Sequence, residues 1–329
     1  MLKNGNVYLE FLQVSKKIGV PIRKILDVFW HLSTKKTVEN NELVRMVGVS
    51  RNALNQVKKE LSLYLDPPSE KTCLRKDAAE RVTELYKNNF LLEEDLLKIL
   101  TTSEVYEQSI KLLSSCKDRR PSPKRAFDQF IATIDTLARR AAILDFLGDV
   151  RAKRILFLGD DDFTSVAIGN IKSHQDITVV DIDSRILDNI GAISDELNLG
   201  IKRVNHDLRK PIPASLKGKF DIVFTDPPYT PEGIQLFVSR ALDAIDQENR
   251  AARIYFCYGN SDRAKERFLP IQNAITAMGL MLRWIFDRFN RYERAESVGN
   301  ASSLYVAEIT PMTKPLIRGV YDKPIYTID

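Results

Sequence analysis

The stretch that decides the fold reads Arg154-Ile-Leu-Phe-Leu158, then Gly159-Asp160-Asp161-Asp162-Phe163, then a helical segment over residues 164–171. An apolar strand, a glycine turn and a helix in this order form the first unit of a Rossmann-like fold. The turn departs from the usual pattern, because three aspartates stand where such folds commonly carry further glycines. We call Gly159 to Asp162 the acidic turn.

Acidic residues also follow the later predicted strands. Asp181-Ile182 ends the second strand, about twenty residues past the turn, where an acid commonly accepts hydrogen bonds from ribose hydroxyls. Asp207-Leu208 follows the third strand, where an acid can accept from an adenine amino group. Because ligands of parallel sheets bind at the carboxyl ends of the strands, we predict a nucleoside site there. Its residues are Gly159, Asp181, Ile182, Asp207 and Leu208.

Strands and helices alternate through the rest of this region, which predicts an α/β domain with a doubly wound sheet. The fourth strand runs into Asp226-Pro227-Pro228-Tyr229, in which consecutive prolines fix the backbone. The predicted strands cover residues 154–158, 177–180, 201–204, 220–225, 252–258, 280–289 and 302–309. The predicted helices cover residues 164–171, 185–197, 232–244 and 262–278, with further helices over 93–115 and 131–147.

The N-terminal third has helical periodicity, a tight turn and Ser50 as the expected cap of a second helix. This pattern, followed by Pro67-Pro68 and residues 71–74 as a wing, predicts a winged-helix-like domain. Such a unit can read DNA or serve as a packing and dimerisation module. We favour packing and a homodimer, because Glu60 and Asp66 offset the nearby basic residues and no basic stripe stands out.

Bulk properties fit two or more domains. The 329 residues are 44% hydrophobic and 28% charged with a net charge of +5, which indicates a globular protein and no expected nucleic-acid partner. No apolar run approaches a membrane span, so we expect a cytoplasmic protein without a membrane partner. Cys73, Cys116 and Cys257 lack metal-ligand spacing and are expected to be buried free thiols, with no metal site. The predicted division is 1–118 winged-helix-like, 119–151 linker and connecting helix, 152–310 Rossmann-like, and 311–329 flexible tail.

The order of glycine turn, acids and Asp-Pro-Pro-Tyr resembles the class I methyltransferase-like fold, whose donor is S-adenosylmethionine. The three carboxylates of the acidic turn would repel the carboxylate of that donor, by about 1 kcal/mol for a pair 4 Å apart in water and by more in a cleft. Decarboxylated S-adenosylmethionine has no carboxylate and ends in an ammonium group. The acidic turn therefore favours this donor, and a polyamine as acceptor, whose reacting amine must lose a proton to a carboxylate base.

The whole chain resembles the branched-chain polyamine synthase family, also called N4-bis(aminopropyl)spermidine synthase, with its Gly-Asp-Asp-Asp and Asp-Pro-Pro-Tyr motifs and C-terminal tail. The resemblance implies aminopropyl transfer from decarboxylated S-adenosylmethionine to the N4 amine of spermidine, with release of methylthioadenosine. It implies no prosthetic group. The implied catalytic residues are Asp160, Asp161, Asp162 and Asp226, with Asp161 the first choice for the base. The predicted acceptor site contains Asp161, Asp162, Asp226, Pro227 and Tyr229, together with Asp128, where the linker enters the domain, and Glu293, near the final hairpin.

Other hypotheses stay open at this point. Asp-Pro-Pro-Tyr also occurs in nucleic-acid amino-methyltransferases, where it grips a flipped base, and the chain could be a polyamine-sensing regulator. Phe127, Phe163 and Trp284 are candidate aromatic walls, although a plain core role is favoured for each. Glu293 and Glu296 are candidate acidic contacts, with solvated loop acids as the favoured alternative. The acids and aromatics of the tail over residues 314–329 suit a lid over a polycation.

Overall fold

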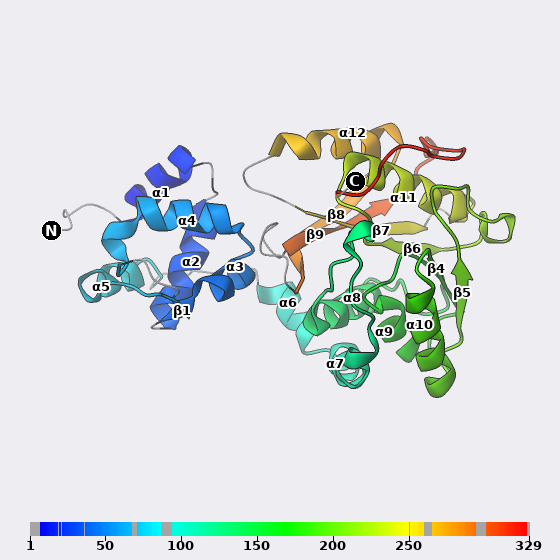
Figure 1. Ribbon diagram of the computed structural model, residues 1–329, viewed down its shortest axis with the longest axis horizontal. Coiled ribbons are helices and arrows are strands. Elements are labelled where there is room, and N and C mark those ends of the chain that lie inside the picture. Colours follow the sequence, from blue (N-terminus) through cyan, green and yellow to red (C-terminus); the bar gives the residue numbers. More distant parts are fainter. Residues whose placement is uncertain are drawn as a thin grey trace. The chain divides into compact units, whose positions relative to one another are not determined.

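A seven-stranded sheet lies at the centre of the larger part of the chain in the computed structural model (Figure 1). The structure describes residues 7–18, 20, 22–35, 37–67, 71–86, 94–249, 251–259, 265–293 and 301–327. Within these residues the strand order is β5-β4-β3-β6-β7-β9-β8; neighbours from β5 to β7 run parallel, and β9 runs antiparallel to β7. The strands are β3 Arg154–Leu158, β4 Asp176–Asp181, β5 Ile201–Asn205, β6 Ile222–Thr225, β7 Arg253–Gly259, β8 Met281–Arg291 and β9 Ala301–Glu308.

The strand order reverses at β3, which has β4 on one side and β6 on the other. In the register of the sheet, Leu158 at the end of β3 lies level with Val180 of β4 and Thr225 of β6. The acidic turn and the Asp-Pro-Pro-Tyr segment therefore leave the sheet side by side. A reversal of this kind is where open α/β sheets bind their ligands.

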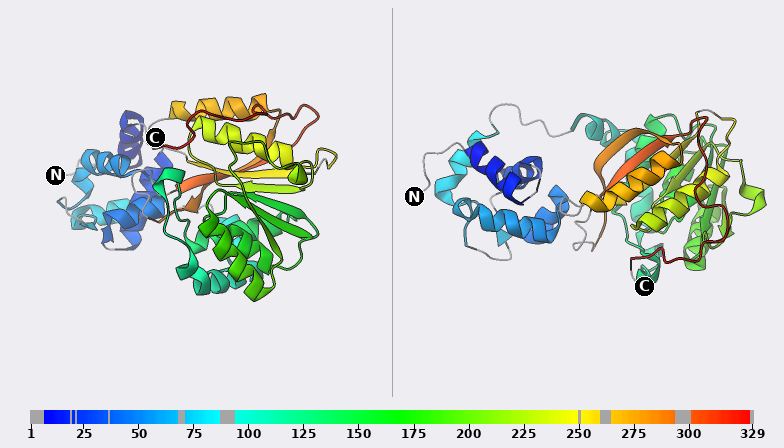
Figure 2. Two further views of the ribbon diagram at one scale, coloured as in Figure 1. Left: turned by 45° about the vertical axis from the view of Figure 1, so that its right-hand side comes forward. Right: turned by 90° about the horizontal axis from the view of Figure 1, so that it is seen from above.

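Helices cover both faces of this sheet (Figures 1 and 2). One face is covered by α8 Ile134–Phe146, α9 Thr164–Asn170 and α10 Ser184–Leu197, and the other by α11 Pro231–Ala244 and α12 Leu269–Ala277. Because β3 and β6 are buried on both faces, their sequences are continuous apolar runs rather than alternating ones. Phe157, Phe224 and Tyr255 fill the interior next to one another.

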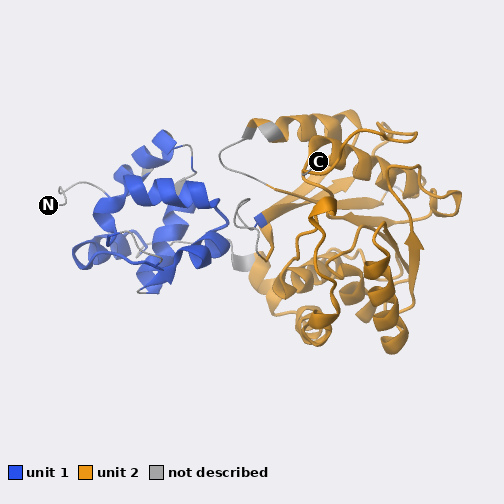
Figure 3. Cartoon of the chain, viewed as in Figure 1, with its two compact units in different colours: residues 1–94, 260–265, 294–301 blue, residues 95–259, 266–293, 302–329 orange. Residues whose placement is uncertain are grey.

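The chain divides into two compact units, shown in different colours in Figure 3. Unit 1 comprises residues 1–94, 260–265 and 294–301, and unit 2 comprises residues 95–259, 266–293 and 302–329. The predicted boundary at residue 118 differs from this division. The reason is that α7, Glu104–Cys116, packs against α8 and α9 and so belongs with the sheet.

Unit 1 contains the helix, turn and second helix that the N-terminal pattern predicts. The Ser50 Oγ atom accepts a hydrogen bond from the Ala53 N–H at 3.1 Å, which confirms the predicted cap of α4. Val38 of β1 pairs with Thr72 of β2 in a short antiparallel ladder. The assignment of this unit as a winged helix stays a prediction. Its elements are α1 Val7–Ile18, α2 Ile22–Thr34, β1 Val38–Glu39, α3 Asn40–Val47, α4 Arg51–Glu60, β2 Lys71–Thr72 and α5 Lys76–Glu84.

Several predicted elements differ from the structure at their ends. The helix predicted over residues 93–115 is two helices, α6 Glu94–Thr101 and α7, because Ser103 accepts from the Tyr106 N–H and starts a new helix. Of the helix predicted over residues 262–278, the structure describes residues 265–278, which begin with a 3-10 turn over Lys265–Phe268 and continue as α12. Interruption by a local cap changes hydrophobic periodicity very little, so the sequence pattern did not reveal these breaks.

The predicted state of the cysteines is confirmed in part. Cys116 and Cys257 are buried free thiols, whereas Cys73 is partly exposed and donates to Asp66. Among the described residues, no helix combines the length and apolar character that crossing a bilayer requires. The same residues contain no group of three or more His, Cys, Asp or Glu side chains placed to hold a metal ion.

Gly279 lies where the C-terminal segment returns to the sheet, and its substitution is a test of that contact. It has a φ of +69°, and a Cβ atom there would lie 2.5 Å from the Met312 carbonyl oxygen. We expect Gly279→Ala to lower the free energy of unfolding by about 2–3 kcal/mol, measured by denaturant unfolding, because strain and overlap add. Gly218→Ala is the matched control, since its φ is +64° but its Cβ meets open space. Equal losses for the two variants would rule out the contact with Met312.

Candidate active site

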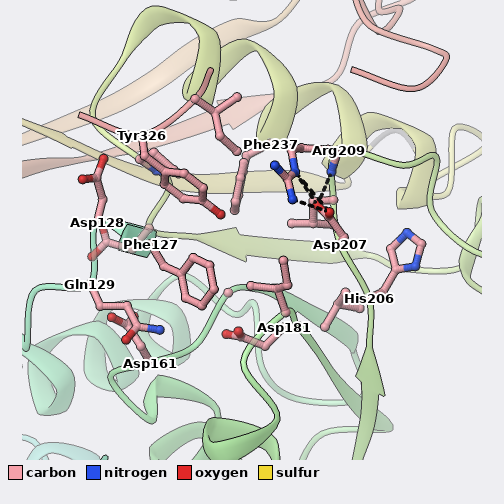
Figure 4. A pocket seen from close by; sticks show the side chains of 17 residues that line it. Phe127, Asp128, Gln129, Asp161, Asp181, His206, Asp207, Arg209, Phe237 and Tyr326 are labelled. Carbon is pink, nitrogen blue, oxygen red and sulfur yellow. Dashed lines mark hydrogen bonds and ion pairs between the residues drawn. The ribbon is translucent and has the colours of Figure 1, made fainter. Parts of the chain in front are cut away.

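A cleft opens at the carboxyl ends of β3, β4, β5 and β6, with about 600 Å³ of empty volume (Figure 4). Aspartates of several segments line it, together with aromatic and aliphatic side chains. Figure 4 shows Tyr326 reaching in from the side opposite Asp161 and Asp181. The lining residues are Phe127, Asp128, Gln129, Gly159, Asp161, Val180, Asp181, Ile182, His206, Asp207, Leu208, Arg209, Asp226, Pro228, Phe237, Ile325 and Tyr326.

The structure brings together most of the site residues predicted from the sequence. Those that line the cleft are Asp128, Gly159, Asp161, Asp181, Ile182, Asp207, Leu208 and Asp226. Five other predicted residues do not line it, namely Asp160, Asp162, Pro227, Tyr229 and Glu293. The reason why each of these residues lies outside the cleft differs. In the acidic turn, the three aspartates have different hydrogen-bond partners and therefore different roles.

Asp160 is turned into the protein and fixes the start of α9. Its Oδ2 atom accepts the Ser165 N–H at 3.0 Å, and its own N–H donates to Asp181 Oδ2 at 3.1 Å. The residue at the helix start, Phe163, has a left-handed φ of +69° and offers no side-chain acceptor, so Asp160 supplies one. Burial raises the pKa of Asp160 to about 8. Asp160 therefore shapes the turn and does not face the cleft.

Asp162 is also buried and is held by two donors from an earlier part of the chain. The Ala132 N–H donates to Asp162 Oδ1 at 2.5 Å, and Arg140 Nη1 donates to Asp162 Oδ2 at 3.2 Å. Burial raises the pKa of Asp162 to about 6, and the charge of Arg140 opposes that rise. With both oxygens engaged, Asp162 joins α8 to the acidic turn.

Asp161 is the carboxylate of the acidic turn that faces the cleft. Within the described residues, no group donates a hydrogen bond to its side chain, in contrast to Asp160 and Asp162. Burial raises its pKa well above the ordinary range, and the charges of Asp162, Asp226 and other neighbouring aspartates raise it further. A carboxyl group in such surroundings holds its proton until a cation approaches, and then becomes a base.

Asp181 organises the part of the cleft that is predicted to hold the nucleoside. Its Oδ1 atom accepts the Asp183 N–H at 2.8 Å and its Oδ2 atom accepts the Asp160 N–H, so one carboxylate ties together the loops after β3 and β4. Each carboxylate oxygen can accept two hydrogen bonds, so capacity remains for ribose hydroxyls. Burial raises the pKa of Asp181 despite these donors.

Asp207 follows β5, the strand that pairs with β4, and forms an ion pair with Arg209. Arg209 Nη2 donates to Asp207 Oδ2 at 2.8 Å, and Arg209 Nε donates to Asp207 Oδ1 at 3.1 Å. Burial raises the pKa of Asp207, but the hydrogen bonds from Arg209 outweigh it and the net shift is downward. Asp207 is therefore a charged, fixed acceptor at the position predicted for the adenine.

The part of the cleft that is predicted to hold the acceptor contains Asp226, which has a layer of tyrosines behind it. Tyr229 donates to Asp226 Oδ1 at 3.0 Å, and Tyr292 donates to Asp226 Oδ2 at 2.7 Å. Tyr229 thus supports Asp226 and does not itself line the cleft, and Pro228 rather than Pro227 lines it. Glu293 is placed elsewhere by its N–H bond to the Ile131 carbonyl at 2.8 Å.

The candidate aromatic walls have different positions. Phe127 lines the cleft and lies 5.8 Å from Tyr326 between ring centroids, whereas Phe163 is fully buried in the core. Trp284 contacts the guanidinium group of Arg253, 5.1 Å from its ring centroid, and does not line the cleft. Glu296 lies outside the described residues.

The tail predicted to be flexible makes tertiary contacts over residues 311–327, which we call the C-terminal strap, and its residues Ile325 and Tyr326 line the cleft. Thr327 donates to Asp128 through both its N–H, at 2.7 Å, and its hydroxyl, at 2.5 Å. The Tyr321 N–H bonds the Arg209 carbonyl at 2.8 Å, and buried Arg240 donates to the Gly319 carbonyl at 2.6 Å. The strap therefore covers the side of the cleft between Asp128 and Arg209.

Sequence reasoning missed Arg140 and Tyr292, which lie behind the lining residues. The signal for Arg140 was the pair Arg139-Arg140 between Leu137-Ala138 and Ala141-Ala-Ile-Leu144, since an arginine buried in such a run needs acidic partners. No local pattern distinguished Tyr292, because its contact with Asp226 spans 66 positions of sequence.

Comparison with known proteins identifies the chain. A family model described as the branched-chain polyamine synthase A C-terminal domain matches residues 108–326. This chain belongs to the branched-chain polyamine synthase family. The match begins within α7 and ends inside the strap, so it includes the whole cleft and its supports.

Curated proteins from other organisms are also similar to this chain. An uncharacterised protein of Methanocaldococcus jannaschii is 35% identical over 90% of this chain and 74% of its own length. The N(4)-bis(aminopropyl)spermidine synthase of Thermococcus kodakarensis is 35% identical over 53% of this chain and 49% of its own length, and that of M. jannaschii is 32% identical over 57% and 53%. The matched region thus spans about half the length of these named synthases.

Solved structures agree on the fold. The branched-chain polyamine synthase of Thermus thermophilus, in complex with N4-aminopropylspermidine and 5'-methylthioadenosine, superimposes with a TM-score of 0.66 at 21% identity over 97% of both chains. A putative RNA methyltransferase of Pyrococcus horikoshii matches with a TM-score of 0.51 at 15% identity, over 63% of this chain and all of that one. The α/β class and the methyltransferase-type sheet predicted from the sequence are confirmed.

Proposed function

We propose that this enzyme transfers aminopropyl groups from decarboxylated S-adenosylmethionine to the N4 amine of spermidine, giving N4-aminopropylspermidine and then N4-bis(aminopropyl)spermidine. Its family membership and the names of its relatives support this reaction. The observation that carries the proposal is the charge of the cleft. The lining residues include five aspartates, whereas the one arginine among them, Arg209, is already paired with Asp207.

Such a cleft selects cations on both sides of the reaction. An ammonium group replaces the carboxylate that an ordinary methyl donor would bring toward the acidic turn, and the acceptor carries further ammonium groups. Opposite charges that approach within about 4–6 Å stabilise the ionised form of a carboxyl group. Binding of the polyamine therefore favours loss of the proton that Asp161 holds in the free enzyme.

We assign Asp161 as the base. It takes the proton from the N4 ammonium, and the freed nitrogen lone pair attacks the aminopropyl carbon next to the sulfonium. The new N–C bond forms as the C–S bond breaks, the bonding electrons return to sulfur, and neutral methylthioadenosine leaves. Asp161 passes this proton to solvent and then takes the proton of the tertiary ammonium product, and the second transfer ends in a quaternary nitrogen that carries no proton.

The other lining residues are proposed to hold the two substrates. Asp181 accepts a hydrogen bond from the ribose, and Asp207 accepts one from the amino group of the adenine. Ile182 and Leu208 pack on the adenine ring. All four residues line the same cleft. Asp226 and Asp128 face the acceptor ammonium groups, with Phe127 and Tyr326 as aromatic walls for cationic charge. Asp160, Asp162 and Tyr229 do not line the cleft, and they act through their hydrogen bonds to the segments that do.

A product assay tests the proposal. Purified protein is incubated with spermidine and with either decarboxylated or intact S-adenosylmethionine, and the products are identified by mass spectrometry. We expect one or two added aminopropyl groups on spermidine and release of methylthioadenosine from the decarboxylated donor alone. A methylated product from the intact donor would favour the methyltransferase alternative, and no product from either would favour the regulator alternative.

The assembly and cellular location of the enzyme stay predictions. We propose a homodimer that forms through unit 1, in which Leu9 and Leu63 are each more than half exposed. We also propose that the enzyme works in the cytoplasm, without nucleic acid as a partner.

A further inference from the structure

A cleft that binds polycations has a buried cation directly beneath it. Arg140 of α8 is fully buried and lies next to the acids of the cleft rather than away from them. A positive charge in this place weakens the attraction of the cleft for an ammonium group. Arg140 therefore has a role other than attraction of the substrate. The role inferred below rests on the function proposed above.

Arg140 divides its donors among separate partners. Its Nη1 atom donates to Asp162 at 3.2 Å, its Nη2 atom to Asp226 at 2.5 Å, and its Nε atom to the Asn290 side-chain oxygen at 2.8 Å. Nη2 also reaches the Tyr292 hydroxyl at 3.2 Å. A guanidinium group can span these positions because it presents five donors in a rigid plane, which a lysine ammonium cannot do.

The acids around Arg140 act on one another. Asp161 faces Asp160 and Asp162 from its own turn, Asp181 from β4 and Asp226 from the end of β6. Arg140 from α8 and Arg120 from the preceding segment are the cations that act on Asp162. Tyr229, Tyr292 and Cys257 are the other titratable groups next to Asp226 or Arg140.

From these contacts we propose that Arg140 is a positioning residue that holds the side chains of Asp162 and Asp226 in place through ion pairs, and so leaves Asp161 as the acid that exchanges the proton of the acceptor. Without Arg140, the side chains of Asp161, Asp162 and Asp226 would lie close together without the cation that pairs with two of them. With it, Asp162 and Asp226 are engaged by the guanidinium group, and Asp161 is the acid that faces the substrate. Arg140 also fixes the distance between the acidic turn and the Asp226 segment.

The first test compares two variants that separate the charge of Arg140 from its shape. The quantity measured is the pH dependence of kcat/KM for aminopropyl transfer. Removal of a buried positive charge raises the proton affinity of the remaining acids. We therefore expect Arg140→Met to move the acidic limb of the profile to higher pH, by about one unit or more. Arg140→Lys keeps the positive charge but loses the planar set of guanidinium donors. We therefore expect kcat to fall at least tenfold, while the acidic limb of the pH profile stays where it is in the wild type.

The single variant Asp162→Asn provides the second test, which does not depend on the stability of Arg140→Met. Asp162→Asn keeps an oxygen that can accept the Ala132 N–H and removes one negative charge, so the limb should move to lower pH. The double variant Arg140→Met/Asp162→Asn removes one charge of each sign. We expect its limb to return toward that of the wild type.

A matched control is Arg253→Met, at the opposite end of the sheet. Arg253 starts β7 and pairs with Asp149 at 2.9 Å, outside the cleft, so its loss should lower the melting temperature without moving the pH profile. Variants are compared only when circular dichroism shows them folded. Profiles of Asp162→Asn and Arg140→Met that superimpose on the wild type would overturn the inference, as would an equal shift in Arg253→Met. Absence of transfer by the wild type would instead overturn the proposed function.

Discussion

Asp161→Asn is expected to lower kcat by a factor of about 10² to 10⁴, the range that a positioned general base commonly contributes. The asparagine keeps the size of the side chain but cannot take the proton from the N4 ammonium. Binding of methylthioadenosine, measured by calorimetry, should stay within a few-fold of the wild type, because the nucleoside side is formed by Asp181 and Asp207. In the wild type, kcat/KM should rise with pH as Asp161 loses its proton, because its protonated form cannot act as a base.

Asp195→Asn is the matched control for this prediction, since Asp195 is an exposed aspartate of α10 in the same unit. It should leave kcat, binding and melting temperature unchanged. An Asp161→Asn enzyme with wild-type turnover would remove Asp161 from the role of base. Equal loss of turnover and of methylthioadenosine binding would move it to a role in donor binding.

The second large effect is expected at Asp181. Asp181→Asn replaces a carboxylate that accepts two backbone N–H groups, from Asp160 and Asp183, with an amide that has one accepting oxygen. Hydrogen bonds to charged groups contribute about 1.5–3 kcal/mol each, and one such loss corresponds to at least tenfold in affinity. Because the variant also disturbs the proposed ribose contact, we expect the Kd of methylthioadenosine to rise about 100-fold or more by calorimetry.

The control for Asp181 is on the same strand. Asp176 begins β4, at the end away from the cleft, and pairs with Lys202 at 2.9 Å in a largely exposed ion pair. Exposed pairs of this kind contribute little, so Asp176→Asn should leave methylthioadenosine binding unchanged. Similar losses in the two variants would show that the effect at Asp181 comes from a weakened strand rather than from its carboxylate.

The sequence alone predicted the strands and helices around the cleft well because their signals are local. The apolar run before Gly159 and the acid at Asp181 belong to one strand, turn, helix and strand unit, in which their positions at the ends of neighbouring strands do not depend on the rest of the chain. The same holds for Ser50, whose capping bond spans three residues. Predictions were weaker where an element ends or a segment docks, as at Ser103 and in the C-terminal strap, because tertiary packing decides those places.

What the sequence determined by itself is the class of fold and the acidic character of the turn, from which a cationic donor was predicted. What only the tertiary structure decided is which of the three is free. Asp162 is engaged by the Ala132 N–H and by Arg140, 30 and 22 residues earlier, and Asp128 meets Thr327 across 199 residues. Hydrogen-bond partners so distant in sequence leave no periodic trace, so the free carboxylate of Asp161 became apparent only in the folded chain.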